Sequence, residues 1–119
     1  MKVKEQKKEI LYANIDAIGG IKDKAEFSDE LDLHIEKLTN DHAKLDRSEK
    51  LRFQLKIFDD YIDQAVRLGI DKVYIIHGLG KGSLRNKIQS KLFENPYIKT
   101  FKNDHHPKYG FGVTEVFIN

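Results

Sequence analysis

The sequence predicts a small two-layer α/β domain whose elements follow the order β-α-β-α-β-β. Residues 30–35 alternate strictly between apolar and polar side chains, which is typical of a half-buried strand. Residues 72–76 are almost continuously apolar, as in a strand buried on both faces of a parallel sheet. Amphipathic segments at 48–68 and 83–94 follow these strands, and such crossovers pair strands in parallel with right-handed connections. A chain of 119 residues with 39% hydrophobic residues fits a single domain.

The first strand is expected over residues 30–35. Its alternation places Leu31, Leu33 and Ile35 on one face and Asp32 and His34 on the other. A polar loop follows this strand. We therefore expect the apolar face to join the core and the polar face to be available for function.

A long helix is expected over residues 48–68. Ser48 is the expected N-cap, and Gly69 is the expected residue at which the helix stops. Its apolar positions recur at spacings of three and four, which places them on one stripe. The stripe consists of Leu51, Leu55, Phe58, Ile62, Ala65 and Val66.

The second half of the chain predicts a strand at 72–76, a helix at 83–94 and two final strands. The helix is expected to end at Asn95-Pro96, because proline cannot continue it. The last two strands are expected at 98–103 and 112–118, joined by a hairpin loop over 104–110.

Residues 1–28 are expected to form an N-terminal arm or linker, separate from a folded domain at 29–119. Gly19-Gly20 interrupts their apolar residues, and the start is rich in lysine and glutamate. Either this is a terminal piece of a longer protein, or the domain carries a packed arm. Since the sequence has no cysteine, no apolar run near the roughly 20 residues of a membrane span and no secretory signal, we expect a cytoplasmic protein without membrane contact.

The positive charge lies toward the end of the chain. The overall net charge is only +2, but residues 77–119 contain seven basic and three acidic residues. Residues 11–76 carry a net charge of −4. This asymmetry favours an anionic partner, although such a block is also common on a solvated face.

A glycine-rich loop stands between the second strand and the following helix. Its three glycines are Gly78, Gly80 and Gly82. Such a loop exposes backbone N–H groups that can bind an anion. Lys81 adds a positive charge, and Arg85 on the first helical turn can donate hydrogen bonds to a phosphate. The spacing fits neither the mononucleotide motif, which needs lysine after the last glycine, nor the dinucleotide motif, whose third glycine would be Ser83. A nucleic-acid backbone is the favoured ligand, with a purely structural turn as the alternative.

Two histidines are expected at the carboxyl ends of neighbouring parallel strands. His34 and His77 can therefore face one cleft, with Asp32 beside them. A carboxylate and two imidazoles can perform general acid–base chemistry on a phosphodiester or hold a divalent ion. Alternatively, each histidine is a polar residue at a strand end that makes its hydrogen bonds and has no catalytic role. In the loop at 104–110, Lys108 is expected to contact a nucleic-acid backbone.

These motifs resemble those of a known family. The segments concerned are Leu31-Asp32-Leu33-His34, then His77-Gly78-Leu79-Gly80-Lys81-Gly82-Ser83-Leu84-Arg85, and finally Gly112-Val113-Thr114-Glu115-Val116. They resemble the LDLHG and HGxGxGxLR motifs of the Smr (small MutS-related) domain. The resemblance implies a fold like the C-terminal domain of a bacterial translation initiation factor. It also implies DNA or RNA as partner, nicking of that nucleic acid, and a longer, MutS-like parent chain.

The resemblance carries roles over to individual residues. It implies Asp32, His34 and His77 as catalytic residues. The expected phosphate-binding residues are Gly78, Gly80, Lys81, Gly82, Ser83, Arg85 and Lys108. No metal ligand is assigned, although a divalent metal is possible.

The chain departs from the family pattern at two places. Ile35 stands where the motif has glycine, and residues 36–47 lengthen the connection to the long helix. Three functions therefore stay open: a nicking endonuclease, a nucleic-acid-binding module that does not cut, and a protein-interaction module.

Overall fold

The computed structural model describes residues 26–80 and 82–119. The elements follow the predicted order, with a short additional helix and a turn of 3-10 helix after the first strand. In chain order they are β1 (Glu30–Asp32), α2 (Ile35–Leu38), the 3-10 helix His42–Lys44, α3 (Arg47–Arg67), β2 (Lys72–Ile76), α4 (Ser83–Glu94), β3 (Ile98–Lys102) and β4 (Val113–Ile118). The strand at 72–76 and the helix at 83–94 were predicted with these bounds.

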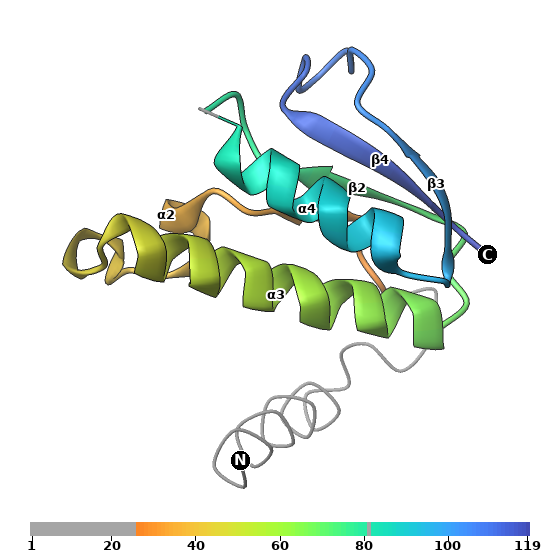
Figure 1. Ribbon diagram of the computed structural model, residues 1–119, viewed down its shortest axis with the longest axis horizontal. Coiled ribbons are helices and arrows are strands. Elements are labelled where there is room, and N and C mark those ends of the chain that lie inside the picture. Colours follow the sequence, from red (N-terminus) through yellow and green to blue (C-terminus); the bar gives the residue numbers. More distant parts are fainter. Residues whose placement is uncertain (1–25, 81) are drawn as a thin grey trace, which may run out of the picture.

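The four strands form one mixed sheet in the order β1-β2-β4-β3 (Figure 1). β1 and β2 are parallel, as predicted from the crossover that connects them. β4 lies between β2 and β3 and is antiparallel to both. The predicted hairpin thus forms between β3 and β4.

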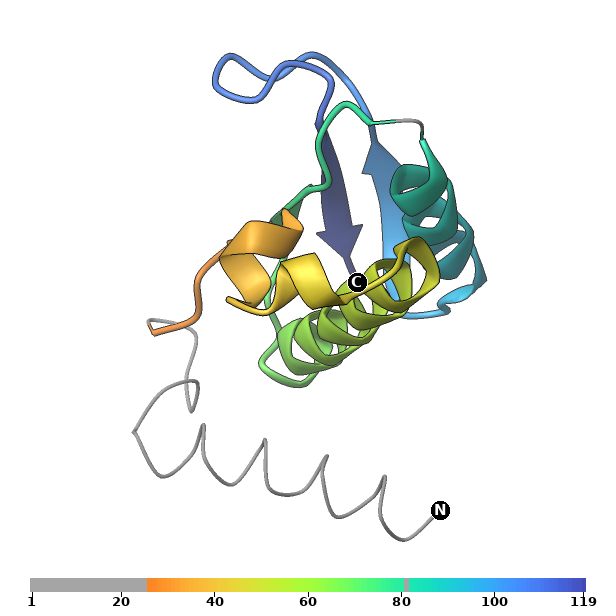
Figure 2. The same ribbon diagram turned by 90° about the vertical axis from the view of Figure 1, so that its left-hand side faces the viewer.

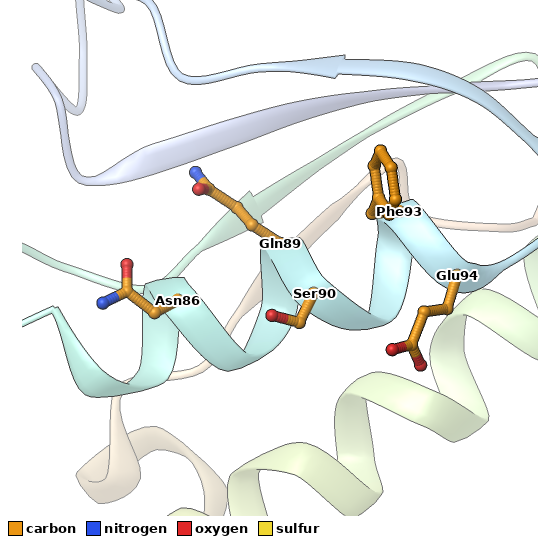
Figure 3. A pocket seen from close by; sticks show the side chains of 5 residues that line it. All are labelled: Asn86, Gln89, Ser90, Phe93 and Glu94. Atoms are coloured by element: carbon orange, nitrogen blue, oxygen red, sulfur yellow. The ribbon is translucent and has the colours of Figure 1, made fainter.

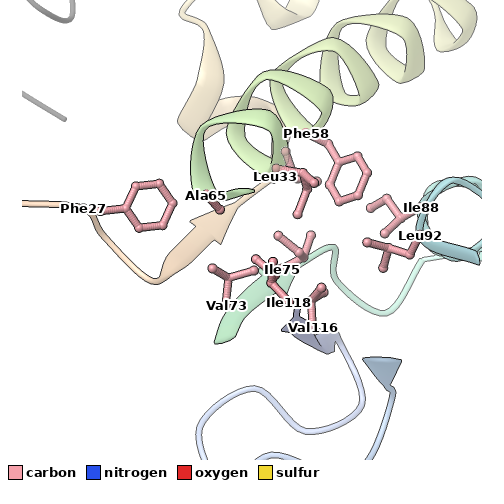
Figure 4. Packing of buried hydrophobic residues seen from close by; sticks show 11 residues of the cluster. Phe27, Leu33, Phe58, Ala65, Val73, Ile75, Ile88, Leu92, Val116 and Ile118 are labelled. Atoms are coloured by element: carbon pink, nitrogen blue, oxygen red, sulfur yellow. The ribbon is translucent and has the colours of Figure 1, made fainter. Parts of the chain in front are cut away.

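Helices α3 and α4 cover the same face of the sheet, so the domain has two layers. Val73 and Val116 are paired across β2 and β4, are fully buried, and face the helices (Figure 4). Phe58 of α3 and Ile88 of α4 pack against them. Phe27, which precedes β1, is also buried in this core.

The loop between β3 and β4 folds back over the other face of the sheet. His106 stands edge-on to the ring of Tyr74 at 5.5 Å. The Tyr109 hydroxyl donates a hydrogen bond of 3.0 Å to the Glu30 carboxylate at the far edge of the sheet. This loop is therefore attached to β1 and β2 as well as to its own strands.

The first strand is shorter than predicted. β1 ends at Asp32, and Ile35 begins α2 rather than continuing the strand. The cause is local, because the Asp32 carboxylate accepts the backbone N–H of His34 at 3.0 Å and turns the chain. Leu33 is still fully buried, and its N–H still bonds to the carbonyl of Ile76.

The N-cap of helix α3 lies two residues before the predicted one. It is Asp46, not Ser48. The Asp46 side chain accepts the N–H of Glu49 at 2.8 Å, and the Glu49 carboxylate accepts the N–H of Asp46 at 3.0 Å. This reciprocal capping box satisfies two backbone donors, whereas a cap at Ser48 would satisfy one. Gly69, with a φ of 70°, follows the helix as predicted.

Three further expectations concern the chain as a whole. The proposed arm at 1–28 falls outside the described residues as far as residue 25. Among the described helices, none combines the length and apolar character needed to cross a membrane. The expected similarity to a translation initiation factor domain stays a prediction.

Candidate nucleic-acid interface

The functional candidates gather at one edge of the sheet. Because β1 and β2 are parallel, their carboxyl ends lie at the same edge, and α3 and α4 both begin there (Figure 1). The loop between β3 and β4 lies at this end too, beside the glycine-rich loop (Figure 2). The topology therefore brings the residues of all these segments into one region.

Asp32 and His34 form a hydrogen-bonded pair at the end of β1. The His34 Nδ1 lies 2.6 Å from the Asp32 Oδ1. Partial burial tends to raise the pKa of Asp32, but the backbone N–H, imidazole and charge of His34, with the charge of Lys37, outweigh it and lower that pKa. An ionised carboxylate accepts the Nδ1 proton, which leaves Nε2 of the neutral imidazole with a free lone pair.

The Nε2 atom of His34 faces the glycine-rich loop. It lies 2.9 Å from the position that a Cβ would occupy on Gly78. Gly78 also has a φ of 82°, so both its conformation and the neighbouring imidazole favour glycine. The side chain of His34 is 44% exposed, so α2, which begins at Ile35, leaves it accessible.

His77 is held inside the protein. Its Nδ1 donates to the carbonyl of Gly78 at 3.0 Å, and its Nε2 accepts from the buried hydroxyl of Thr114 at 2.8 Å. Burial lowers the pKa of His77; the Gly78 carbonyl opposes this, while the charges of Arg85 and His34 add to it. The ring is therefore neutral at pH 7, and both its nitrogens are used within the protein.

Gly112 fixes the start of the glycine-rich loop. Its carbonyl accepts hydrogen bonds of 3.0 Å from the N–H groups of both His77 and Gly78. A Cβ on Gly112 would lie 3.2 Å from the Cα of Gly78, so only glycine allows this close approach without a shift of the backbone. The loop is thus anchored to β4 as well as to β2.

A groove of about 570 Å³ separates the glycine-rich loop from the first turns of α3. On the loop side it is lined by His77, Gly78, Gly80, Gly82, Ser83, Leu84 and Arg85, and on the helix side by Arg47, Ser48, Lys50, Leu51 and Gln54. The Arg85 guanidinium lies over Gly82, 2.9 Å from its ideal Cβ position. Gly80 has open space at that position.

The structure brings most of the predicted site residues together. Asp32, His34 and His77 surround Gly78, and the other two glycines with Ser83 and Arg85 line the groove. Lys108 lies apart from the groove, with its Nζ 5.0 Å from the ring of Tyr109. Lys81 lies outside the described residues.

Sequence reasoning missed three contributors to this region. Thr114 binds His77, and nothing in the local sequence of β4 indicates that contact. Arg47 and Lys50 line the groove from α3. They could have been found from the topology, because two helices that follow parallel strands both begin at the carboxyl edge of the sheet.

A second hollow of the described surface lies outside this region. An open pocket of about 410 Å³ runs along the outer side of α4 (Figure 3). It is lined by Asn86, Gln89, Ser90, Phe93 and Glu94. Since its one charged residue is acidic, it does not suit a phosphate. Within residues 26–80 and 82–119, no group of three His, Asp or Glu side chains is placed to hold a metal ion.

Fold and site together define a two-layer α/β domain with an Asp–His pair against a glycine-rich loop. The sequence model of the Smr domain matches residues 49–119, which is more than half of the chain. The chain therefore belongs to the Smr domain family.

Curated relatives are named as MutS2 endonucleases. That of Staphylococcus haemolyticus is 43% identical over 56 residues, 47% of this chain and 7% of the relative. That of Lactobacillus johnsonii is 33% identical over 81 residues, 67% of this chain and 10% of the relative. The chain thus matches only a tenth or less of the length of these relatives.

Solved structures of similar fold are Smr domains. The Smr domain of Thermus thermophilus MutS2 superposes with a TM-score of 0.58 and 27% identity, over 76% of this chain and 96% of that one. YdaL, a stand-alone small MutS-related protein from Escherichia coli, gives a TM-score of 0.50 at 21% identity, over 76% of this chain and 64% of that one. These matches confirm the predicted family and the mixed α/β fold.

Proposed function

We propose that this domain binds DNA or RNA and nicks it with His34 as the proton-transferring residue. The observation that carries the proposal is the Asp32–His34 pair, whose free Nε2 faces the glycine-rich loop. A loop of exposed N–H groups can hold a phosphate within reach of that nitrogen. The names of the MutS2 relatives support an endonuclease.

His34 acts as general base in this mechanism. Its Nε2 accepts a proton from the attacking oxygen and later returns one to the leaving oxygen. Asp32 fixes the tautomer and orientation of the ring through Nδ1 and stabilises the imidazolium that forms, as a carboxylate does beside a catalytic histidine.

We propose a role for His77 that differs from the catalytic one expected from sequence. With both its nitrogens bonded to Gly78 and Thr114, it has no free atom for a substrate proton. We assign it as a positioning residue that shapes the loop at Gly78. Through that loop it sets where a phosphate stands relative to His34.

The glycine-rich loop and its cations hold the phosphate. Gly80 and Ser83 line the groove, where their backbone N–H groups can donate to a phosphate, and Arg85 can donate two parallel hydrogen bonds to phosphate oxygens. Lys81, which stands between Gly80 and Gly82 in the sequence, adds a further positive charge.

The decisive experiment compares nicking of supercoiled plasmid and of a structured RNA by four proteins: wild type, Asp32→Asn, His34→Ala and the control His105→Ala. Loss of general acid–base catalysis should lower the rate about 10²–10⁴-fold in the first two variants. The exposed His105 should be replaceable without effect. Unchanged nicking in both Asp32→Asn and His34→Ala would refute the assignment, and binding without nicking by wild type would leave a binding module.

A longer parent chain and a cytoplasmic location are part of the same proposal. The MutS2 relatives are about ten or more times longer than the region they share with this chain. We propose that this domain acts at one end or within such a longer protein, where other parts select the nucleic acid.

A further inference from the structure

The groove beside the glycine-rich loop is positively charged on both walls. Arg47 and Lys50 stand on the α3 wall and Arg85 on the loop wall. No aspartate or glutamate is among the described residues that line it. An anion in the groove would therefore meet cations from two sides.

These cations are not neutralised elsewhere in the described part of the chain. Basic residues farther along the same helices do form ion pairs, with Lys56 at 3.2 Å from Asp60 and Lys91 at 3.2 Å from Asp59. None of the three groove cations takes part in an ion pair among the described residues. Their charge is thus available to a ligand.

The carboxylates nearest in sequence are already engaged. Asp46 and Glu49 bind each other's backbone N–H groups in the capping box. Their carboxylates therefore accept backbone N–H groups at the start of α3. The attraction of the groove for an anion therefore comes from the side chains of Arg47 and Lys50.

The groove differs in position from the Asp32–His34 pair. Gly78 lies between the two, because it lines the groove and the Nε2 of His34 lies 2.9 Å from the position that a Cβ on Gly78 would occupy. Neither Asp32 nor His34 lines the groove itself. A phosphate held by Arg47 and Lys50 on the α3 wall is therefore separate from the phosphate that the glycine-rich loop and Arg85 hold for attack at His34.

The size of the groove selects the form of the nucleic acid. A volume of about 570 Å³ lies within the range of about 300–1,000 Å³ of pockets for small molecules. It can enclose a nucleotide or two of a single strand, whereas a duplex, whose major groove alone is about 12 Å wide, cannot enter.

We propose that this groove is a second phosphate subsite, which holds the backbone of a single-stranded segment next to the scissile phosphate. Arg47 and Lys50 are its binding residues. The proposal rests on the proposed function for the identity of the neighbouring site. It adds that a nucleic acid must be unpaired on one side of the cut.

The test measures binding of a fluorescent single-stranded oligonucleotide by anisotropy over a series of salt concentrations. The variant Arg47→Gln/Lys50→Gln removes two groove cations. The control Arg52→Gln/Lys56→Gln removes two exposed cations of the same helix that do not line the groove. Each phosphate contact contributes about 0.7 to the slope of log affinity against log salt, so the groove variant should flatten that slope by about 1.4.

The control variant should keep the wild-type slope, and the charge-conserving variant Arg47→Lys/Lys50→Arg should keep most of it. For a duplex of the same length, the groove variant should bind almost as well as wild type. In the nicking assay its KM should rise while kcat changes little. Equal slopes for the groove and control variants, or an equal loss on single strand and duplex, would overturn the subsite.

The result separates this proposal from the proposed function. A flattened slope with nicking unaffected by His34→Ala would keep the groove and reject His34 as the base. Loss of nicking in His34→Ala with unchanged slopes in Arg47→Gln/Lys50→Gln would keep the active site and reject the groove.

Discussion

Thr114 provides the strongest test of how the glycine-rich loop is supported. It is fully buried on β4, and its hydroxyl donates to the Nε2 of His77 at 2.8 Å. The substitution Thr114→Val replaces this hydroxyl with a methyl group of similar size. The ring nitrogen of His77 then loses its partner in a place where water cannot replace it.

An unpaired buried acceptor costs about 1–3 kcal/mol of folding free energy. For a domain of this size, about 1 kcal/mol lowers Tm by roughly 4–8 °C. Urea and thermal unfolding followed by circular dichroism measure both quantities. We expect Thr114→Val to fall within this range, with little change in the urea m-value.

A double-mutant cycle with His77→Phe isolates the hydrogen bond. If the cost comes from the unpaired nitrogen, Thr114→Val should cost less than about 0.5 kcal/mol once His77 is replaced. An equal cost in both backgrounds would show that valine disturbs packing instead. A cost below about 0.5 kcal/mol in the wild-type background would refute the reasoning altogether.

Three further predictions concern stability. Asp46→Ala should lower the free energy of unfolding by about 1 kcal/mol through loss of the N-cap, whereas Ser48→Ala should change it little; equal effects in urea titrations would contradict the assigned cap. Gly112→Ala should cost about 1–3 kcal/mol, because its Cβ would press on the backbone of Gly78 at 3.2 Å, and unfolding at the wild-type midpoint would contradict this. Folding lowers the pKa of His77 from 6.5, so the unfolded chain binds a proton at this residue before the folded chain does as the pH falls. The free energy of unfolding should therefore decrease below about pH 6.5. The variant His77→Gln should lose less free energy of unfolding between pH 7 and 5 than wild type, and an equal loss would contradict the shift.

The sequence predicted best those elements whose own residues favour one type of structure with clear ends. The run at 72–76 is almost continuously apolar and is followed by a glycine-rich loop, so both its type and its length were clear. The helix at 83–94 likewise lies between Gly82 and Asn95-Pro96, which allow no extension in either direction.

The failures occurred where two local signals compete. The alternation of residues 30–35 favours a strand up to Ile35, but the carboxylate of Asp32 captures the N–H of His34 and ends it. Ser48 and Asp46 are both good N-caps when considered alone. The spacing of Asp46 and Glu49 was the signal that could have decided between them.

The catalytic candidates were proposed from their positions at the ends of strands and from the family resemblance, but their division of roles was not. Sequence treats His34 and His77 alike, since both follow a strand. Only the packing of β4 against β2 shows that Thr114 occupies one nitrogen of His77. Such contacts join residues far apart in the chain, and no local pattern records them.

The position of β4 in the sheet has a consequence for synthesis of the protein. Because Val113–Ile118 forms the strand between β2 and β3, the nascent chain on the ribosome can form β1, β2 and both long helices, yet cannot close its sheet. Until this last segment leaves the exit tunnel, one edge of β2 is without its partner, and β3 has no neighbour at all. Such an unpaired edge invites association with other chains. A stalled or shortened product that ends before Gly112 would therefore be prone to aggregation and would lack the anchor of the glycine-rich loop.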